Sequence, residues 1–258
     1  MPEAADALAL PRGLDIDWAQ PWLAPYRQSG PSAQRDLEAG LRVADALNRQ
    51  LERSAIQLVA GPLRFTAPAT AAPPEAYEAH IARTAQVPTR DNLHDLFNGL
   101  VWLAFPHLKR CLNELQARQI ALHGVGPQRG AVRDRLTLLD ENGALWQAPA
   151  LLVEALRRRD WRALFVTHRA AWQDARTTLV GHALLEKLTA PRKAITAHVW
   201  VVPDGVDAEA WIADALTIDH PASRVHLPLP VLGVPGWWPA NESEGFYTDA
   251  TVFRPLRG

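Results

Sequence analysis

Residues 89–106 of the 258-residue chain read TRDNLHDLFNGLVWLAFP, and they form its most strongly patterned stretch. The apolar side chains recur at helical spacing as far as Phe105, and Thr89 is a residue type that favours a helix N-cap. Pro106 interrupts the pattern because proline lacks a backbone N–H. We therefore expect one helix up to Phe105 and a second from Pro106 to about Leu122.

Weaker patterns on both sides predict the rest of the secondary structure. Helices are expected at 32–53, 75–83, 150–159, 161–176, 179–188 and 208–216. Strands are expected at 63–66, at 136–140 with a turn at 141–143, and at 195–202. From Arg224 the chain is mostly Pro, Gly and aromatic residues, which favours an irregular wrapping over the core.

These elements predict an α+β fold that is mainly helical, with a few short strands, in a single globular domain. We expect an extended lead-in over residues 1–31 and one domain over residues 32–258, because no long linker or repeat divides the chain.

Composition excludes several classes of protein. With 27 Lys and Arg against 28 Asp and Glu, the formal charge is −1, so we expect neither nucleic-acid binding nor an anionic membrane as partner. The single cysteine, Cys111, excludes an intramolecular disulfide and a zinc site built on several thiolates. No signal sequence or membrane-length apolar run is present, which favours a soluble, cytoplasmic protein. The sequence leaves the oligomeric state open.

Four polar residues within the 89–106 stretch carry possible chemistry. Asp91, His94, Asp95 and Asn98 are spaced i, i+3, i+4 and i+7, which places them on one face of the expected helix. Carboxylates and an imidazole one turn apart can ligate a metal ion or form an acid/base pair. The alternative is a solvated polar face in which Asp91 favours the positive end of the helix dipole.

Two further segments can complete such a site. His182 and Glu186 are four residues apart on an expected helix, and His198 lies in an expected strand. Together with His94 and Asp95 they would make a divalent-metal site of imidazole and carboxylate, which suits a metal-assisted hydrolase. Arg90 or Arg133 would bind an anionic group of a small-molecule ligand. Each histidine taken singly is more often structural.

Five segments of the chain resemble a bacterial family catalogued as domain of unknown function 3025. They are 89–106, 133–141, 181–187, 228–238 and the ending Val252-Phe253-Arg254, and the resemblance extends from about Arg64 to Arg254. The resemblance implies a single domain, and it implies no activity, because the family carries none that can be transferred.

Two hypotheses of function follow. The first is a hydrolase acting on a small or phosphorylated substrate, with Arg90, Asp91, His94, Asp95 and Asn98 as catalytic residues. The second is a non-enzymatic structural or binding module, in which the His, Asp and Arg segments form a buried packing network.

Overall fold

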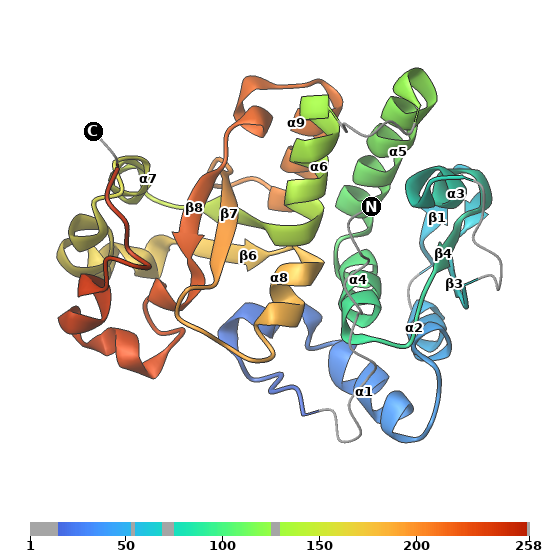
Figure 1. Ribbon diagram of the computed structural model, residues 1–258, viewed down its shortest axis with the longest axis horizontal. Helices are drawn as coiled ribbons and strands as arrows, with labels where there is room; N and C mark the ends of the chain where they lie inside the picture. Colours follow the sequence, from blue (N-terminus) through green and yellow to red (C-terminus); the bar gives the residue numbers. More distant parts are fainter. Residues whose placement is uncertain (1–14, 53–54, 69–74, 125–129, 257–258) are drawn as a thin grey trace. The chain divides into compact units, whose positions relative to one another are not determined.

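The computed structural model describes residues 15–52, 55–68, 75–124 and 130–256 (Figure 1). The fold is mainly helical α+β with short strands, as the sequence predicts. Contacts along the backbone divide the chain into two compact units. The first comprises Met1–Ala19 and Leu23–Thr137, and the second comprises Gln20–Trp22 and Leu138–Gly258. The predicted division into residues 1–31 and 32–258 stays a prediction.

The first unit is built from helices with two small pairs of strands. Its helices are α1 (Gly30–Glu38), α2 (Val43–Leu51), α3 (Tyr77–Thr84), α4 (Leu93–Ala104) and α5 (Pro106–His123). The short strands β1 (Gln57–Leu58) and β2 (Gly61–Pro62) pair antiparallel, and β3 (Arg64–Thr66) and β4 (Gln86–Pro88) pair parallel. The 3-10 helix η1 (Pro21–Tyr26) begins in the second unit and ends in the first.

Helices α4 and α5 meet as the sequence predicts, but α4 starts later. Thr89 is not the N-cap: the side chain of Asn92 accepts a hydrogen bond from the backbone N–H of Asp95 at 2.8 Å, and the helix begins at Leu93. Threonine and asparagine both favour the N-cap position, so the sequence alone does not select Asn92 over Thr89. Pro106 opens α5, where its missing N–H costs nothing.

The second unit contains a four-stranded sheet in the order β6-β5-β7-β8. Its strands are β5 (Gly143–Gln147), β6 (Arg176–Leu179), β7 (Thr196–Val201) and β8 (Leu227–Pro230). β5 pairs antiparallel with β6 and parallel with β7, and β7 pairs antiparallel with β8. All five residues of β5 are buried, as expected of a central strand.

Helices and short turns surround this sheet (Figure 1). The helices are α7 (Ala150–Arg157), α8 (His182–Lys187) and α9 (Ala208–Thr217), of which α7 contacts β8 and α9 contacts β5. Short helical turns complete the unit: η2 (Ala163–Thr167), η3 (Arg169–Asp174), η4 (Pro221–Arg224), η5 (Val231–Gly233), η6 (Pro239–Glu242) and η7 (Glu244–Thr248).

Three predicted elements are wrong. The strand expected at 136–140 is part of helix α6 (Gly130–Asn142), because its apolar run fits either period and the helix buries Leu136 and Leu139, three residues apart. The helix expected at 32–53 is two helices, separated where Gly40 adopts a φ of 92°. The helix expected at 161–176 is the pair of short turns η2 and η3, followed by β6.

The predictions at two other places need qualification. The tail after Arg224 is mostly irregular, but it supplies the edge strand β8. The first three residues of the expected helix 179–188 belong to the end of β6 and the segment that follows it, so α8 is shorter than predicted. The glycine-containing segment 124–130, whose composition favours a loop, lies mostly outside the described residues.

Candidate functional site

His182 begins helix α8 in the second unit, and only 5% of its surface is exposed. The chain reaches it directly from strand β6. The backbone N–H groups of Val180 and Gly181 both donate to the carbonyl oxygen of Gly143, at 3.0 and 2.9 Å. His182 is therefore fixed against the point where α6 ends and β5 begins.

Two glycines permit this close approach of backbones. A Cβ atom on Gly181 would lie 2.5 Å from the nitrogen of Gly143 and 2.6 Å from the carbonyl oxygen of Glu141. The φ of Gly181 is −74°, which any residue can adopt, so glycine is required here for space. A Cβ on Gly143 would lie 2.3 Å from the carbonyl oxygen of Leu139.

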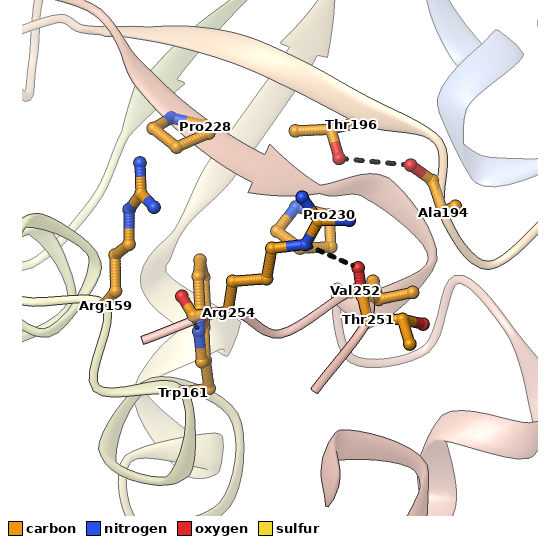
Figure 2. Close-up of a pocket in the computed structure, with 9 residues that line it drawn as sticks. All are labelled: Arg159, Trp161, Ala194, Thr196, Pro228, Pro230, Thr251, Val252 and Arg254. Atoms are coloured by element: carbon orange, nitrogen blue, oxygen red, sulfur yellow. Dashed lines mark hydrogen bonds between the residues drawn. The ribbon is translucent and has the colours of Figure 1, made fainter. Parts of the chain in front are cut away.

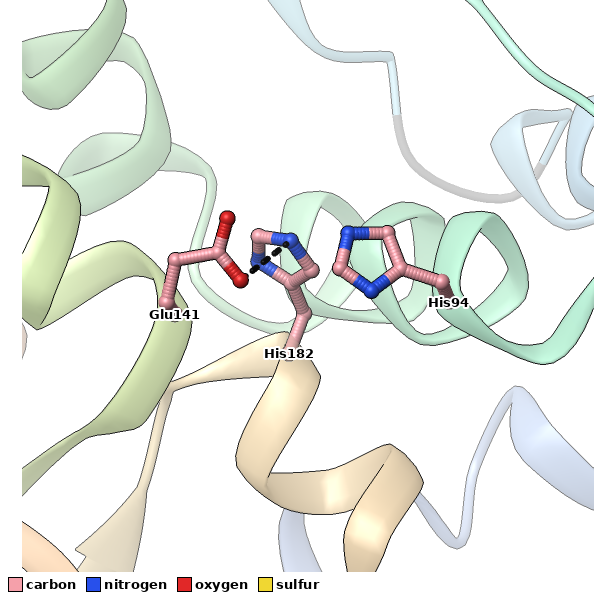
Figure 3. A group of neighbouring side chains, drawn as sticks. All are labelled: His94, Glu141 and His182. Atoms are coloured by element: carbon pink, nitrogen blue, oxygen red, sulfur yellow. Dashed lines mark ion pairs between the residues drawn. The ribbon is translucent and has the colours of Figure 1, made fainter. Parts of the chain in front are cut away.

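The last turn of α6 presents two carboxylates to the His182 ring. His182 Nε2 lies 3.5 Å from Glu141 Oε2, and Nδ1 lies 3.9 Å from Asp140 Oδ2. Figure 3 shows the Glu141 carboxylate directed at the imidazole; the figure also labels His94, a residue of α4 in the first unit. Carboxylates at the C-terminal end of a helix are unfavourable to the helix dipole, so they gain from a nearby cation.

The sequence nominated His182 but missed both carboxylates. The sequence pattern predicts a strand ending at Asp140 and a turn from Glu141, and because this secondary structure is wrong it does not indicate that the two carboxylates share a helix end. The spacing of Leu136 and Leu139, three residues apart, is the sequence signal that also fits a helix ending beside these carboxylates.

Glu186 and Lys187 end the same short helix. Lys187 Nζ donates to Asn142 Oδ1 at 2.9 Å, which ties the end of α8 to the end of α6. Glu186, four residues after His182, is half-buried. This supports the predicted proximity of Glu186 to His182 along one helix, and its predicted role as a metal ligand stays a prediction.

His198 lies on β7, where its Cα is paired with Gly143 across the sheet. Its ring contacts His226, with 3.1 Å between the two Nδ1 atoms. Burial is the main cause that lowers the pKa of His198, and the nearby His226 and Lys187 lower it further. Burial also lowers the pKa of His226. The sequence does not predict this contact, because His226 follows His198 by 28 residues and no local pattern indicates that the two side chains meet.

In the first unit, both aspartates nominated from the sequence are held by arginines. Asp91 lies before α4, not on its face, and accepts from Arg42 Nε and from the backbone N–H of Val43, each at 2.9 Å. Asp95 is buried. Its carboxylate accepts from the backbone N–H of Arg90 at 2.6 Å and from the Arg90 guanidinium at 2.9 and 3.1 Å.

The other candidate residues of this unit differ in their burial and in their hydrogen-bond partners. His94 is half-buried in the first turns of α4. Asn98 is buried, accepts from Lys109 Nζ at 2.8 Å and donates to the Tyr77 hydroxyl at 3.0 Å. Arg133 is buried on α6, and its predicted binding of an anion stays a prediction. Lys109 and Asn98 form a buried polar pair that connects α5 to α4.

Comparisons with known proteins give a family and no activity. A sequence model of the family described as "Protein of unknown function (DUF3025)" matches residues 63–257, which confirms the resemblance predicted from the sequence. No curated protein and no solved structure matches the chain. In the parts of the chain that the structure describes, every helix is too short or too polar to cross a lipid bilayer.

Proposed function

Since the chain belongs to the DUF3025 family, whose description assigns no activity, we propose a function from the site alone. His182 and Glu141 bind one divalent metal ion, which serves a hydrolase acting on a small or phosphorylated substrate. The distance of 3.5 Å between His182 Nε2 and Glu141 Oε2 carries this proposal.

That distance suits two metal ligands better than a hydrogen bond. A charge-assisted hydrogen bond between a nitrogen and a carboxylate oxygen measures about 2.7–2.9 Å. Two donor atoms, each about 2.1 Å from a tetrahedral ion, are separated by about 3.4 Å. A divalent ion between His182 and Glu141 fits this spacing without movement of either residue.

Neighbouring carboxylates support such a site. Asp140 Oδ2 lies 3.9 Å from the other ring nitrogen of His182, too far for a hydrogen bond but close enough for its charge to favour a cation at this site. Catalytic zinc sites use three protein ligands and keep one position open. Of the residues nominated from the sequence, Asp95 is held by Arg90 and His198 contacts His226. We propose Glu186, four residues after His182 on the same helix, as the third ligand.

A divalent ion held in this way supplies a water molecule of lowered pKa as the nucleophile for hydrolysis. The chain's own contribution is a neutral imidazole and a carboxylate as ligands. The backbone contact between Gly143 and Gly181 holds His182 and Glu141 at a fixed separation.

Metal titration of the full chain tests the proposal. After treatment with a chelator, the wild-type protein is expected to bind one Zn²⁺ or Co²⁺ per chain by isothermal titration calorimetry. His182→Ala and Glu141→Gln should each weaken binding by at least about tenfold, and His107→Ala, a change of an exposed histidine on α5, should not. Absence of stoichiometric binding by the wild type, or equal affinity in His182→Ala, would refute the metal site.

Activity is tested separately on the metal-loaded protein. Release of p-nitrophenol from p-nitrophenyl phosphate and p-nitrophenyl acetate should require the ion and be lost in His182→Ala while the circular dichroism spectrum is unchanged. Glu186→Gln, compared in the same titration, tests the proposed third ligand. If the protein binds metal and hydrolyses neither ester, the metal site stands and hydrolysis of these ester types is excluded.

A second function, a non-enzymatic structural or binding module, is favoured by one set of observations. In the first unit, Arg90 donates to Asp95. Lys109 donates to Asn98. Both candidate residues therefore have partners within the protein, as a packing network requires. On this hypothesis, His94→Ala and Asp95→Ala chiefly lower the melting temperature. Loss of a measured activity in both variants, without loss of stability, would rule it out.

A further inference from the structure

A pocket of about 290 Å³ in the second unit is separate from the residues of the proposed metal site (Figure 2). Arg159 and Arg254 line it, and no Asp or Glu does. Its apolar lining includes Trp161, Pro228 and Pro230. The volume is at the lower end of the range for small-molecule sites, which suits a compact ligand.

Arg159 reaches this pocket from an unusual backbone position. It follows α7 with a φ of 51°, in the left-handed region. Its N–H donates to the carbonyl of Leu156 at 3.0 Å, and the N–H of Asp160 donates to that of Ala155 at 2.9 Å. These two bonds define a Schellman motif, whose left-handed position is usually glycine. Glycine would form the same turn with less strain, so the backbone does not explain the arginine.

Arg254 is held in place from two directions. Its carbonyl oxygen accepts a hydrogen bond from the Trp161 indole Nε1 at 2.9 Å, and its own Nε donates to the carbonyl of Thr251 at 2.8 Å. The Trp161 ring is in turn stacked on Phe165, with 9° between the ring planes. The guanidinium therefore enters the pocket from a fixed segment of chain, and the Trp161 ring beside it is fixed as well.

Neither arginine of the pocket is neutralised within the described residues, where no ion pair involves Arg159 or Arg254. The neighbouring carboxylate of Asp249 is 3.2 Å from Lys193 Nζ, and it accepts hydrogen bonds from Thr251. Two guanidinium groups thus face one small pocket with no internal counter-ion.

We propose that this pocket binds a small organic anion, whose phosphate or carboxylate group lies between Arg159 and Arg254. The planar guanidinium groups donate pairs of hydrogen bonds to either type of anion. The apolar part of the ligand packs on Trp161 and the two prolines. The site does not depend on the metal site, and it adds a ligand that the proposed function does not require.

Calorimetric titration of the full chain with four probes tests the inference. The probes are phenyl phosphate, benzoate, inorganic phosphate and the neutral phenol. The wild type should bind phenyl phosphate or benzoate more tightly than phenol and inorganic phosphate, and the stronger of the two identifies the anionic group. The affinity should fall as the salt concentration rises.

The Arg159→Gly variant separates loss of the site from loss of the fold. It removes the guanidinium and also the left-handed strain, so the anion affinity should fall at least about tenfold while the melting temperature stays equal or rises. Arg254→Ala should weaken binding to a similar extent. Arg158→Ala is the matched control, because Arg158 is the adjacent residue but pairs with Glu154 at 2.6 Å outside the pocket.

Several results would overturn the inference. They are failure of the wild type to bind either organic anion, binding of phenol or inorganic phosphate as tightly as the organic anions, and unchanged affinity in both arginine variants. His182→Ala should retain anion binding, and Arg159→Gly should retain metal binding. The failure of one proposal is thereby distinguished from the failure of the other.

Discussion

Replacing Gly181 by alanine adds one methyl group at the junction that fixes His182. The new Cβ would lie 2.5 Å from the nitrogen of Gly143 and 2.6 Å from both the nitrogen of Asn142 and the carbonyl oxygen of Glu141. Ordinary contacts of this kind begin at 3.4 Å, so the backbones must separate by almost 1 Å. All three atoms belong to the main chain, and none can rotate away.

The expected cost follows from two opposing effects. Overpacking of this kind destabilises proteins by about 1–3 kcal/mol. The lower entropy of the unfolded chain with alanine returns about 0.4–1 kcal/mol. We therefore expect the free energy of unfolding to fall by about 1–2 kcal/mol. The same displacement moves His182 from Glu141, so the metal affinity should fall with it.

Urea unfolding followed by tryptophan fluorescence measures the effect, and Gly245→Ala is the matched control. A Cβ on Gly245 would have only an ordinary contact, 3.6 Å from Ser243 Oγ, and this glycine is exposed. That variant should be as stable as the wild type or slightly more stable. If Gly181→Ala unfolds at the same urea concentration as Gly245→Ala, the steric reasoning about this junction is refuted.

Three further variants test other parts of the molecule. Asn92→Ala removes the N-cap of α4 and should lower the free energy of unfolding by about 1 kcal/mol in a urea titration, whereas no change would show that the cap contributes nothing. Asp95→Ala leaves the backbone N–H of Arg90 without its carboxylate and should cost about 1–3 kcal/mol by thermal unfolding; a smaller loss than in Asn92→Ala would contradict this ranking. Burial lowers the pKa of His198 and of His226 in the folded protein, so the unfolded chain binds more protons and stability falls as the pH drops below about 6.5. His226→Gln should reduce the stability difference between pH 7.5 and pH 5.5, and an unchanged difference would exclude this pair as its source.

The sequence predicted those elements whose signal is local. Pro106 marks the start of α5, and the β-rich run that contains Trp200 predicts β7. The segment at 136–140 failed, because four consecutive apolar or β-branched residues fit a strand as well as a helix. The sequence does not predict β8, because Pro228 and Pro230 argue against a strand, although an edge strand such as β8 tolerates them.

The candidate site was predictable only in part. His182 could be nominated by residue type, but its partner Glu141 was hidden by the wrong assignment of α6. His226 meets His198 only through the pairing of β7 with β8, which depends on tertiary structure. The pocket arginines, Arg159 and Arg254, are far apart in the chain and were not recognised as a pair.

The central position of strand β5 has a consequence for synthesis of the chain. β5 ends at Gln147, but its parallel partner β7 is complete only at Val201. At about 5–20 residues per second, ribosomes need roughly 3–10 s to cover that interval. During this time the edge of β5 that will pair with β7 has no partner, and it is open to pairing with other chains. The nascent second unit thus exposes a sheet edge for seconds, and its yield in cells should depend on chaperones that shield such segments.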